Sequence, residues 1–314
     1  MKRKEIFKLL VILTTLLFGC RDKKQSSRIG LFDISKDDKS VLFSFYRSSG
    51  ISILNVDLNG AGLREIIPST IDSNFYNPKF NKDGSKILFI GNRKGKEIGC
   101  TVFLANPDGS GKTKIFSDKG EITEAVFSDC EDKIYYIRSN EFGHSSPLGE
   151  DQPHNSDIYS INLTTKVIEQ VTHLNAYSMY RVSEYDCGKI MMSMAYDSIP
   201  GILMFSKDSP GKLISINPLN NPRKDNSLYN TPFYSEKFNT LGFIAPYELY
   251  YMGMKDKHAN LVIYDELMVS YFRFFNKQKK LVYINDKGGA FYLINYDGSN
   301  LKEISIDKLI KQKY

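Results

Sequence analysis

Short apolar runs alternate with turn-forming residues along most of the chain. Between residues 77 and 116 the apolar runs are 78–80, 87–90, 101–105 and 113–116, and they are separated by turn residues at 82–84, 92–95 and 106–111. This pattern predicts four short strands in series, which form one antiparallel four-stranded meander. Because so small a sheet cannot bury both of its faces, it must pack against neighbouring copies of itself.

The same pattern recurs along the sequence. The segment NPKFNKDGSKILFI at 77–90 has counterparts in EAVFSDCEDKIYYI at 124–137 and YRVSEYDCGKIMMS at 180–193, with weaker copies at 33–44 and 271–284. The second half of the unit recurs at 53–63, 103–112, 159–167 and 292–301. Matching positions Leu42, Leu88 and Tyr135 are 46 and 47 residues apart. A period of this length is typical of propellers built from four-stranded sheets.

The repeats predict an all-β fold, a six-bladed β-propeller of four-stranded antiparallel blades over residues 29–306. Blade one covers 29–67, blade two 77–116, blade four 178–216 and blade six 270–306, and blade three begins at 122. Blade five has strands at 241–245, 249–253 and 260–264 and no clear outer fourth strand, and residues 217–239 are expected to be a connection. Five or seven blades remain open. The first strand, near Ile29, could complete the last blade, or the two ends could simply abut.

The repeat resembles the WD-like repeat of the TolB-like propeller family. A blade of that family has a proline-containing strand, a Ser-Pro-Asp-Gly-Lys turn, an apolar strand and a strand that ends in Asp-Gly-Ser. This chain has KDGSK at 82–86 and Asp-Gly-Ser at 108–110 and 297–299. The resemblance covers about 29–306, most clearly 75–172. It implies a propeller of the bacterial cell envelope that docks partners on one of its faces.

The first nineteen residues differ from all that follow. Lys2, Arg3, Lys4 and Lys8 precede or begin an apolar run at 9–18. This run is too short to span a bilayer and is typical of a secretory signal peptide. The tetrapeptide at 17–20, Leu-Phe-Gly-Cys, resembles a bacterial lipobox and predicts lipidation, including palmitate, at Cys20. The predicted organisation is a signal peptide at 1–19, a lipidated tether at 20–28, the propeller at 29–306 and a tail at 307–314.

Charge and cysteine content narrow the class of protein further. The net charge is +6, and residues 1–19 carry four basic residues and one acidic residue, so the remainder has a net charge of +3. Acidic residues are interleaved throughout, which excludes the basic stripe that nucleic-acid binding requires.

Cys130 and Cys187 lie in equivalent turns of successive repeats, so we expect them on different blades. We expect these two and Cys100 to be free or buried thiols. No Cys-x-x-Cys or His-x-x-His pair occurs, so neither a metal nor a cofactor is expected.

The longest connection inside a blade, at 139–157, contains the candidate binding residues. Long loops on a rigid scaffold are where binding residues concentrate. An alternative is that this is only a tolerated surface loop. The candidate partner-binding residues are Glu141, His144, Glu150, Asp151, His154 and Asp157.

No nucleophile elbow, phosphate loop, His-Glu-x-x-His helix or dinucleotide-binding glycine pattern is present. This absence, the lipobox-like tetrapeptide and the resemblance to TolB-like propellers together lead us to expect a monomeric, non-enzymatic, lipid-anchored binding or scaffold protein. The expected partner is an envelope protein or a peptidoglycan-associated one. The protein is expected at the outer membrane facing the periplasm, with the cell surface as an alternative. The alternative function is a glycan lyase or hydrolase that uses His144 or His154 with Glu150 or Asp151 as an acid–base pair.

Overall fold

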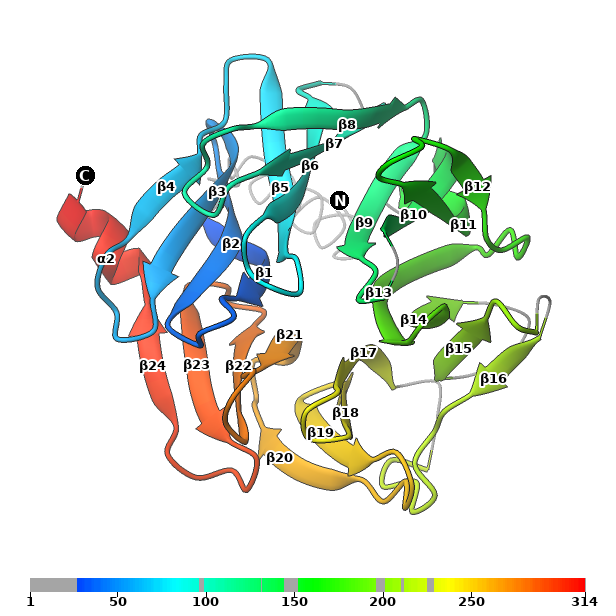
Figure 1. Ribbon diagram of the computed structural model, residues 1–314. Coiled ribbons are helices and arrows are strands. Elements are labelled where there is room, and N and C mark those ends of the chain that lie inside the picture. Colours follow the sequence, from blue (N-terminus) through cyan, green and yellow to red (C-terminus); the bar gives the residue numbers. More distant parts are fainter. Residues whose placement is uncertain are drawn as a thin grey trace, which may run out of the picture.

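Six four-stranded sheets surround a common axis in the computed structural model (Figure 1). The structure describes residues 27–95, 99–130, 132–143, 152–195, 201–209, 212–224 and 229–313. Every sheet is built from four consecutive antiparallel strands, and the first strand of each lies nearest the axis. This arrangement confirms the predicted six-bladed β-propeller.

The strands follow one another in chain order around the ring. Blades one and two comprise β1 (Arg28–Ile34), β2 (Ser40–Arg47), β3 (Gly50–Asp57), β4 (Arg64–Ile67), β5 (Ser73–Phe80), β6 (Ile87–Arg93), β7 (Cys100–Ala105) and β8 (Thr113–Asp118). Blades three and four comprise β9 (Glu121–Phe127), β10 (Lys133–Gly143), β11 (Gln152–Asn162), β12 (Ile168–Gln170), β13 (Ser178–Asp186), β14 (Lys189–Ala195), β15 (Ile202–Ser206) and β16 (Leu213–Ser215). Blades five and six comprise β17 (Asn230–Ser235), β18 (Thr240–Ala245), β19 (Glu248–Gly253), β20 (Asn260–Tyr264), β21 (Val269–Phe274), β22 (Lys280–Asn285), β23 (Ala290–Asn295) and β24 (Lys302–Ser305).

The apolar core is divided among the six blade interfaces. Strands that alternate in direction and are buried on both faces present apolar side chains to the blade on either side. Between blades one and two, for example, Leu42 and Ile53 pack in one cluster with Phe75 and Phe89. A comparable cluster lies at each of the other five interfaces. Each blade is therefore stabilised mainly by its two neighbours.

The ring closes by direct contact between blades one and six. The N–H of Ile29 donates a hydrogen bond of 2.7 Å to the carbonyl oxygen of Gly288. The ring of Phe32 meets the rings of Tyr271 and Phe291 edge to face, each at 5.1 Å between centroids. β1 is the innermost strand of its own sheet, so no strand is exchanged between the ends of the chain. Of the two closure schemes left open by the sequence, the structure selects abutting ends.

Blade five differs from its prediction. The strands expected at 241–245, 249–253 and 260–264 are β18, β19 and β20, and β20 is the outer strand. The strand that the prediction missed is the inner one, β17, which lies within the segment expected to be a connection. The pattern of β17 was obscure because the strand is short, contains Pro232 and is interrupted by a register irregularity between Asn230 and Phe233.

After the last strand, the expected tail forms a helix, α2 (Ile306–Lys313), whose first residue is fully buried against blades one and six. Among the described residues, no helix has the length and apolar composition needed to cross a membrane.

Candidate functional site

A pocket of about 490 Å³ lies on the axis, where the six inner strands end. Its wall is formed by the last residues of β1, β5, β9, β13, β17 and β21 and by the turns that follow them. We call this cavity the axial pocket and the side on which it opens the pocket face. Because all six blades contribute to it, the pocket exists only in the closed ring.

The inner strand of every blade is irregular. The pairing register between the first and second strand shifts in all six blades. At three of these sites a residue other than glycine has a positive φ, namely Asn77 (53°), Arg181 (62°) and Thr231 (54°). The N–H groups of Asn77 and Thr231 donate to the Ser44 and Ser193 hydroxyls of the preceding blade, each at 2.8 Å. Such bulges bend a strand and turn its side chains in a new direction.

Asp33, Lys79 and Arg273 line the floor of the axial pocket. Each is the second-to-last residue of its inner strand, so the ring symmetry brings these three positions together. The Arg273 Nε atom lies 3.3 Å from Asp33 Oδ1. The Lys79 Nζ atom donates a hydrogen bond of 2.6 Å to the hydroxyl of Tyr271.

Two further charged residues complete this group. Glu124 of β9 is buried, and its Oε1 atom accepts hydrogen bonds from the backbone N–H (3.0 Å) and a guanidinium N–H (2.8 Å) of Arg181. The Arg181 guanidinium carbon lies 5.3 Å from the ring centroid of Tyr271. These contacts connect blades three and four with blade six across the axis. We call the set the floor cluster; its members are Asp33, Lys79, Glu124, Arg181, Tyr271 and Arg273.

Burial changes the proton affinity of Lys79. Removal from water, together with the nearby positive charge of Arg273, lowers the pKa of Lys79 to about 7, and the carboxylates of Asp33 and Glu124 only partly oppose this change. Burial also raises the pKa of Tyr271, so its hydroxyl stays protonated at neutral pH. The floor of the pocket therefore holds an amine that exchanges a proton near neutral pH, hydrogen-bonded to a neutral phenol.

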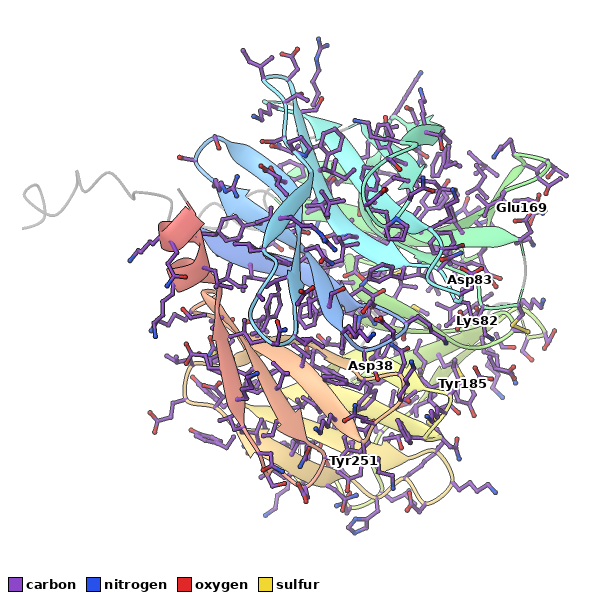
Figure 2. All side chains as sticks on the ribbon, turned by 60° about the vertical axis from the view of Figure 1, so that its left-hand side comes forward. Asp38, Lys82, Asp83, Glu169, Tyr185 and Tyr251 are labelled. Atoms are coloured by element: carbon purple, nitrogen blue, oxygen red, sulfur yellow. A yellow bond between two sulfur atoms is a disulfide. The ribbon has the colours of Figure 1, made fainter. Side chains whose placement is uncertain are left out.

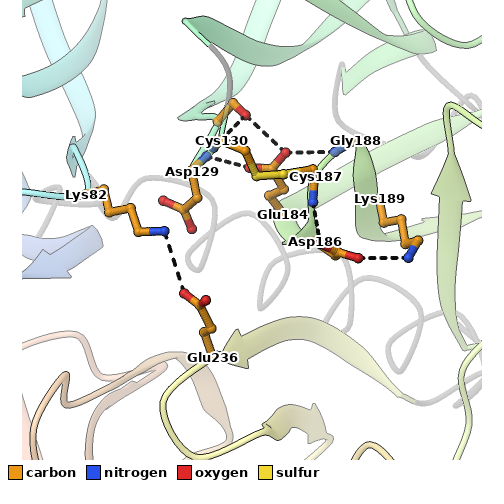
Figure 3. Close-up of a disulfide and its surroundings, with 10 residues drawn as sticks. Lys82, Asp129, Cys130, Glu184, Asp186, Cys187, Gly188, Lys189 and Glu236 are labelled. Atoms are coloured by element: carbon orange, nitrogen blue, oxygen red, sulfur yellow. Dashed lines mark hydrogen bonds and ion pairs between the residues drawn. A yellow bond between two sulfur atoms is a disulfide. The ribbon is translucent and has the colours of Figure 1, made fainter.

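The rim of the axial pocket contains charged residues from opposite blades. Lys82, in the turn after β5, lies 3.7 Å from Glu236, in the turn after β17, and Figure 3 shows this ion pair reaching between blades two and five. Both side chains are largely exposed. Lys82 and Tyr185 lie on the same side of the molecule in Figure 2, and both line the pocket. The rim of the axial pocket therefore presents both positive and negative side chains to the solvent.

A disulfide joins Cys130 and Cys187 at this rim, which makes the expectation of free thiols at these positions wrong. Their Cα atoms are 5.6 Å apart because equivalent turns of successive blades lie side by side around the axis. Beside the disulfide, Glu184 accepts hydrogen bonds from the backbone N–H groups of Asp129 (2.6 Å) and Gly188 (3.1 Å), as Figure 3 shows. Cys100 is buried and unbridged, as expected.

The segment expected to be a long loop, 139–157, is largely a continuation of β10 and β11. The ladder between these strands extends beyond Arg138 and Asp157 to the pairs Glu141–His154 and Gly143–Gln152. Because β10 runs away from the pocket face, this extended hairpin projects from the opposite side of the propeller. The structure therefore separates the hairpin from the axial pocket.

Two of the candidate partner-binding residues have buried side chains that make hydrogen bonds within the protein. His154 is buried, and its Nδ1 and Nε2 atoms lie 3.1 and 3.0 Å from the carbonyl oxygens of Tyr177 and Gly143. Asp157 is 3% exposed and accepts hydrogen bonds from Thr172 Oγ1 (2.8 Å) and the N–H of Leu174 (2.6 Å). These side chains hold the hairpin to the following connection.

The other candidates divide into two groups. Glu141 is exposed on the hairpin and remains available for a partner. His144, Glu150 and Asp151 lie outside the described residues, as does Cys20, the predicted lipidation site.

Sequence reasoning missed the floor cluster, although one signal was present. In the repeat, Lys79 and Arg273 occupy the position at which blade three has Val126, next to the end of the inner strand. A charged residue at a repeat position that is apolar in other copies indicates that its side chain has polar or charged neighbours there. Within the described ranges, no group of three or more His, Cys, Asp or Glu side chains is arranged to hold a metal ion.

No protein-family model matches the sequence, and no curated protein sequence is similar to it. The fold is similar to that of solved structures. TolB from Acinetobacter baumannii matches with a TM-score of 0.63 and 13% identity over 91% of this chain and 65% of TolB, so the chain spans about two thirds of that protein's length. A chain of a nidogen/laminin complex matches with a TM-score of 0.62 and 9% identity, over 90% of this chain and 95% of the other. Oligogalacturonate lyase from Vibrio parahaemolyticus matches with a TM-score of 0.55 and 12% identity, over 87% and 76%. Identities this low establish the fold alone, and the fold is a TolB-like six-bladed β-propeller.

Proposed function

We propose that this protein is a non-enzymatic binding protein of the bacterial cell envelope, anchored by a lipid on Cys20, that docks an envelope protein or a peptidoglycan-associated partner on its pocket face. The observation that carries the proposal is the axial pocket, to which all six blades contribute. Binding sites on rigid repeat scaffolds are typically formed by loops that converge on one face. The hairpin that holds Glu141 is the competing surface, because it projects from the opposite side.

Three features support export to the envelope. The N-terminal pattern of basic residues, apolar run and Leu-Phe-Gly-Cys is that of a lipoprotein signal. The disulfide between Cys130 and Cys187 suits an oxidising compartment, because disulfides are rare in reducing cytosol. The similarity in fold to TolB fits the same location.

Anchoring is tested by metabolic labelling with a fatty-acid analogue. The wild-type chain is expected to take up label and to fractionate with membranes, and the Cys20→Ala variant is expected to do neither. A lipid chain supplies membrane affinity without any spanning helix. Equal labelling of the two proteins would remove the anchor from the proposal.

Docking is tested by site-specific photo-crosslinking in cells that make the protein. A photoreactive amino acid replaces Lys82 or Lys237, both exposed on the pocket face. Matched positions are Glu141 on the hairpin and Lys114 on the outer edge of blade two, also exposed. A specific partner is expected to crosslink from Lys82 and Lys237 but not from Lys114. Crosslinking from Glu141 alone would move the docking surface to the hairpin and overturn the proposal.

A further inference from the structure

Lys79 is a buried amine with no acidic partner. Its side chain is 3% exposed, and among the described residues its one hydrogen bond is to the hydroxyl of Tyr271. No carboxylate of the described chain forms an ion pair with it. Burying an ammonium group without a counter-charge is strongly unfavourable. A protein that needed only packing at this site would be more stable with an apolar side chain such as Val126, which occupies the same repeat position in blade three.

The charges around Lys79 leave one positive charge uncompensated. The carboxylate of Asp33 pairs with Arg273 at 3.3 Å, and that of Glu124 pairs with Arg181 at 2.8 Å. These two acidic side chains come from β1 and β9, and the two arginines come from β21 and β13. The floor cluster therefore contains three basic side chains and two carboxylates. When Lys79 is protonated, the cluster has one more positive than negative charge.

The axial pocket provides room for an anion. Lys79 and Arg273 both line the cavity, whose volume of about 490 Å³ lies in the range of small-molecule sites. Aromatic residues, including Phe80, Phe127 and Phe233, line the wall near them and can pack against the body of a ligand. An ammonium has three N–H donors, and Tyr271 accepts only one of them. Two donors remain for a ligand that enters from the pocket face.

We propose that the axial pocket binds a small organic carboxylate, whose anionic group pairs with the ammonium of Lys79 beside Arg273. Charge-assisted hydrogen bonds of this kind are stronger than neutral ones, more so in a site removed from water. This binding does not require a protein partner, so it stands or falls separately from docking on the pocket face.

The proposal predicts that binding depends on pH. Burial lowers the pKa of Lys79 to about 7. A bound carboxylate raises it again. Protons are therefore taken up on binding near and above pH 7. Affinity is expected to be greatest below pH 7 and to fall by up to about tenfold per pH unit above it. The charged or titratable groups that face Lys79 are Asp33, Glu124, Arg181, Arg273 and Tyr271. The charges of the first four contribute to its pKa of about 7.

Isothermal titration calorimetry on the chain from residue 21 onward tests the proposal with two pairs of probes. Benzoate and glucuronate carry a carboxylate, and benzamide and glucose are their neutral counterparts. At least one carboxylate is expected to bind more tightly than its counterpart. Titration in two buffers with different ionisation enthalpies is expected to show proton uptake at pH 7.5.

Three variants assign the binding to Lys79. Lys79→Met is expected to weaken carboxylate binding by at least about tenfold. Lys79→Arg keeps a permanent charge and is expected to bind without the pH dependence. Lys36→Met removes an exposed lysine that lines the same pocket and is expected to bind like wild type. Thermal melting checks that each variant is folded. Equal binding of charged and neutral probes, no binding of either carboxylate, or unchanged binding by Lys79→Met would overturn the proposal.

Discussion

The carboxylate of Asp38, in the first turn of blade one, clamps the backbone of blade six at Asn276. Asp38 Oδ1 accepts a hydrogen bond of 2.6 Å from the Asn276 N–H, and Oδ2 accepts one of 2.7 Å from the Lys277 N–H. These residues are 238 and 239 positions apart in the sequence. Because no strand is exchanged between the ends of the chain, such side-chain contacts help to keep the ring closed.

Replacing Asp38 with Asn is therefore expected to destabilise the fold. Asn tolerates the φ of 62° at this position but offers only one acceptor oxygen, so one backbone N–H of blade six loses its partner. The free energy of unfolding should fall by about 1.5–3 kcal/mol, as measured by denaturant titration. The matched control is Asp83→Asn, in the equivalent turn of blade two, where the exposed carboxylate binds only within its own turn. A change no larger than that of the control would contradict a clamping role for Asp38.

The disulfide predicts a specific labelling pattern. Alkylation of unfolded, unreduced protein from an oxidising compartment should modify Cys100 but neither Cys130 nor Cys187. The double variant Cys130→Ser/Cys187→Ser should lose about 2–4 kcal/mol of stability, because the bond closes a long loop in the unfolded chain. Peptide mapping by mass spectrometry checks the pattern. Alkylated Cys130 or Cys187 in such protein would show that the bond does not form.

The buried amine of Lys79 predicts that stability rises with pH. Its pKa is about 7 in the folded protein and near the ordinary value of 10.5 when unfolded, so between these values the unfolded chain binds more protons. The free energy of unfolding should rise from pH 7 by up to about 1.4 kcal/mol per pH unit.

The useful window for this measurement ends near pH 8.5. Burial raises the pKa of the Cys100 thiol to about 12, so above pH 9 the unfolded chain releases a proton that the folded chain keeps, and this contribution offsets the rise in stability due to Lys79. Denaturant titrations from pH 7 to 8.5 on wild type and Lys79→Met isolate the contribution of the amine. The variant should show a flatter profile, and identical slopes would contradict burial of an unpaired Lys79.

Asp157 is predicted to stabilise the blade-three hairpin. Its carboxylate binds Thr172 Oγ1 and the N–H groups of Leu174 and Asn175. Asp157→Asn should lower the free energy of unfolding by about 2–3 kcal/mol, because at least one buried donor loses its acceptor. Glu141→Gln, on the exposed part of the same hairpin, should change it by less than about 0.5 kcal/mol. Denaturant titration of both variants is the test, and similar small effects would show that Asp157 is dispensable for folding.

The sequence by itself determined the repeat and most of the strands. Period-two apolar patterns and turn residues are local signals, so β6, β7 and the turn at Lys82-Asp83-Gly84 could be placed from neighbouring residues alone. The same signals failed for β17, whose Pro232 and register irregularity disguise a strand that is held by the adjacent blades. They also failed for the extension of β10 and β11, whose polar composition is typical of a loop.

Only the tertiary structure decided which residues meet at the axis. Lys79 and Tyr271 are 192 residues apart, and no local pattern relates them. They meet because a closed ring of six blades brings equivalent ends of the inner strands to one axis. The same geometry places the turns of Cys130 and Cys187 side by side and allows a disulfide between different blades. Repeat positions can be read along the chain, whereas contacts between repeats depend on the number of blades and on how the ring closes.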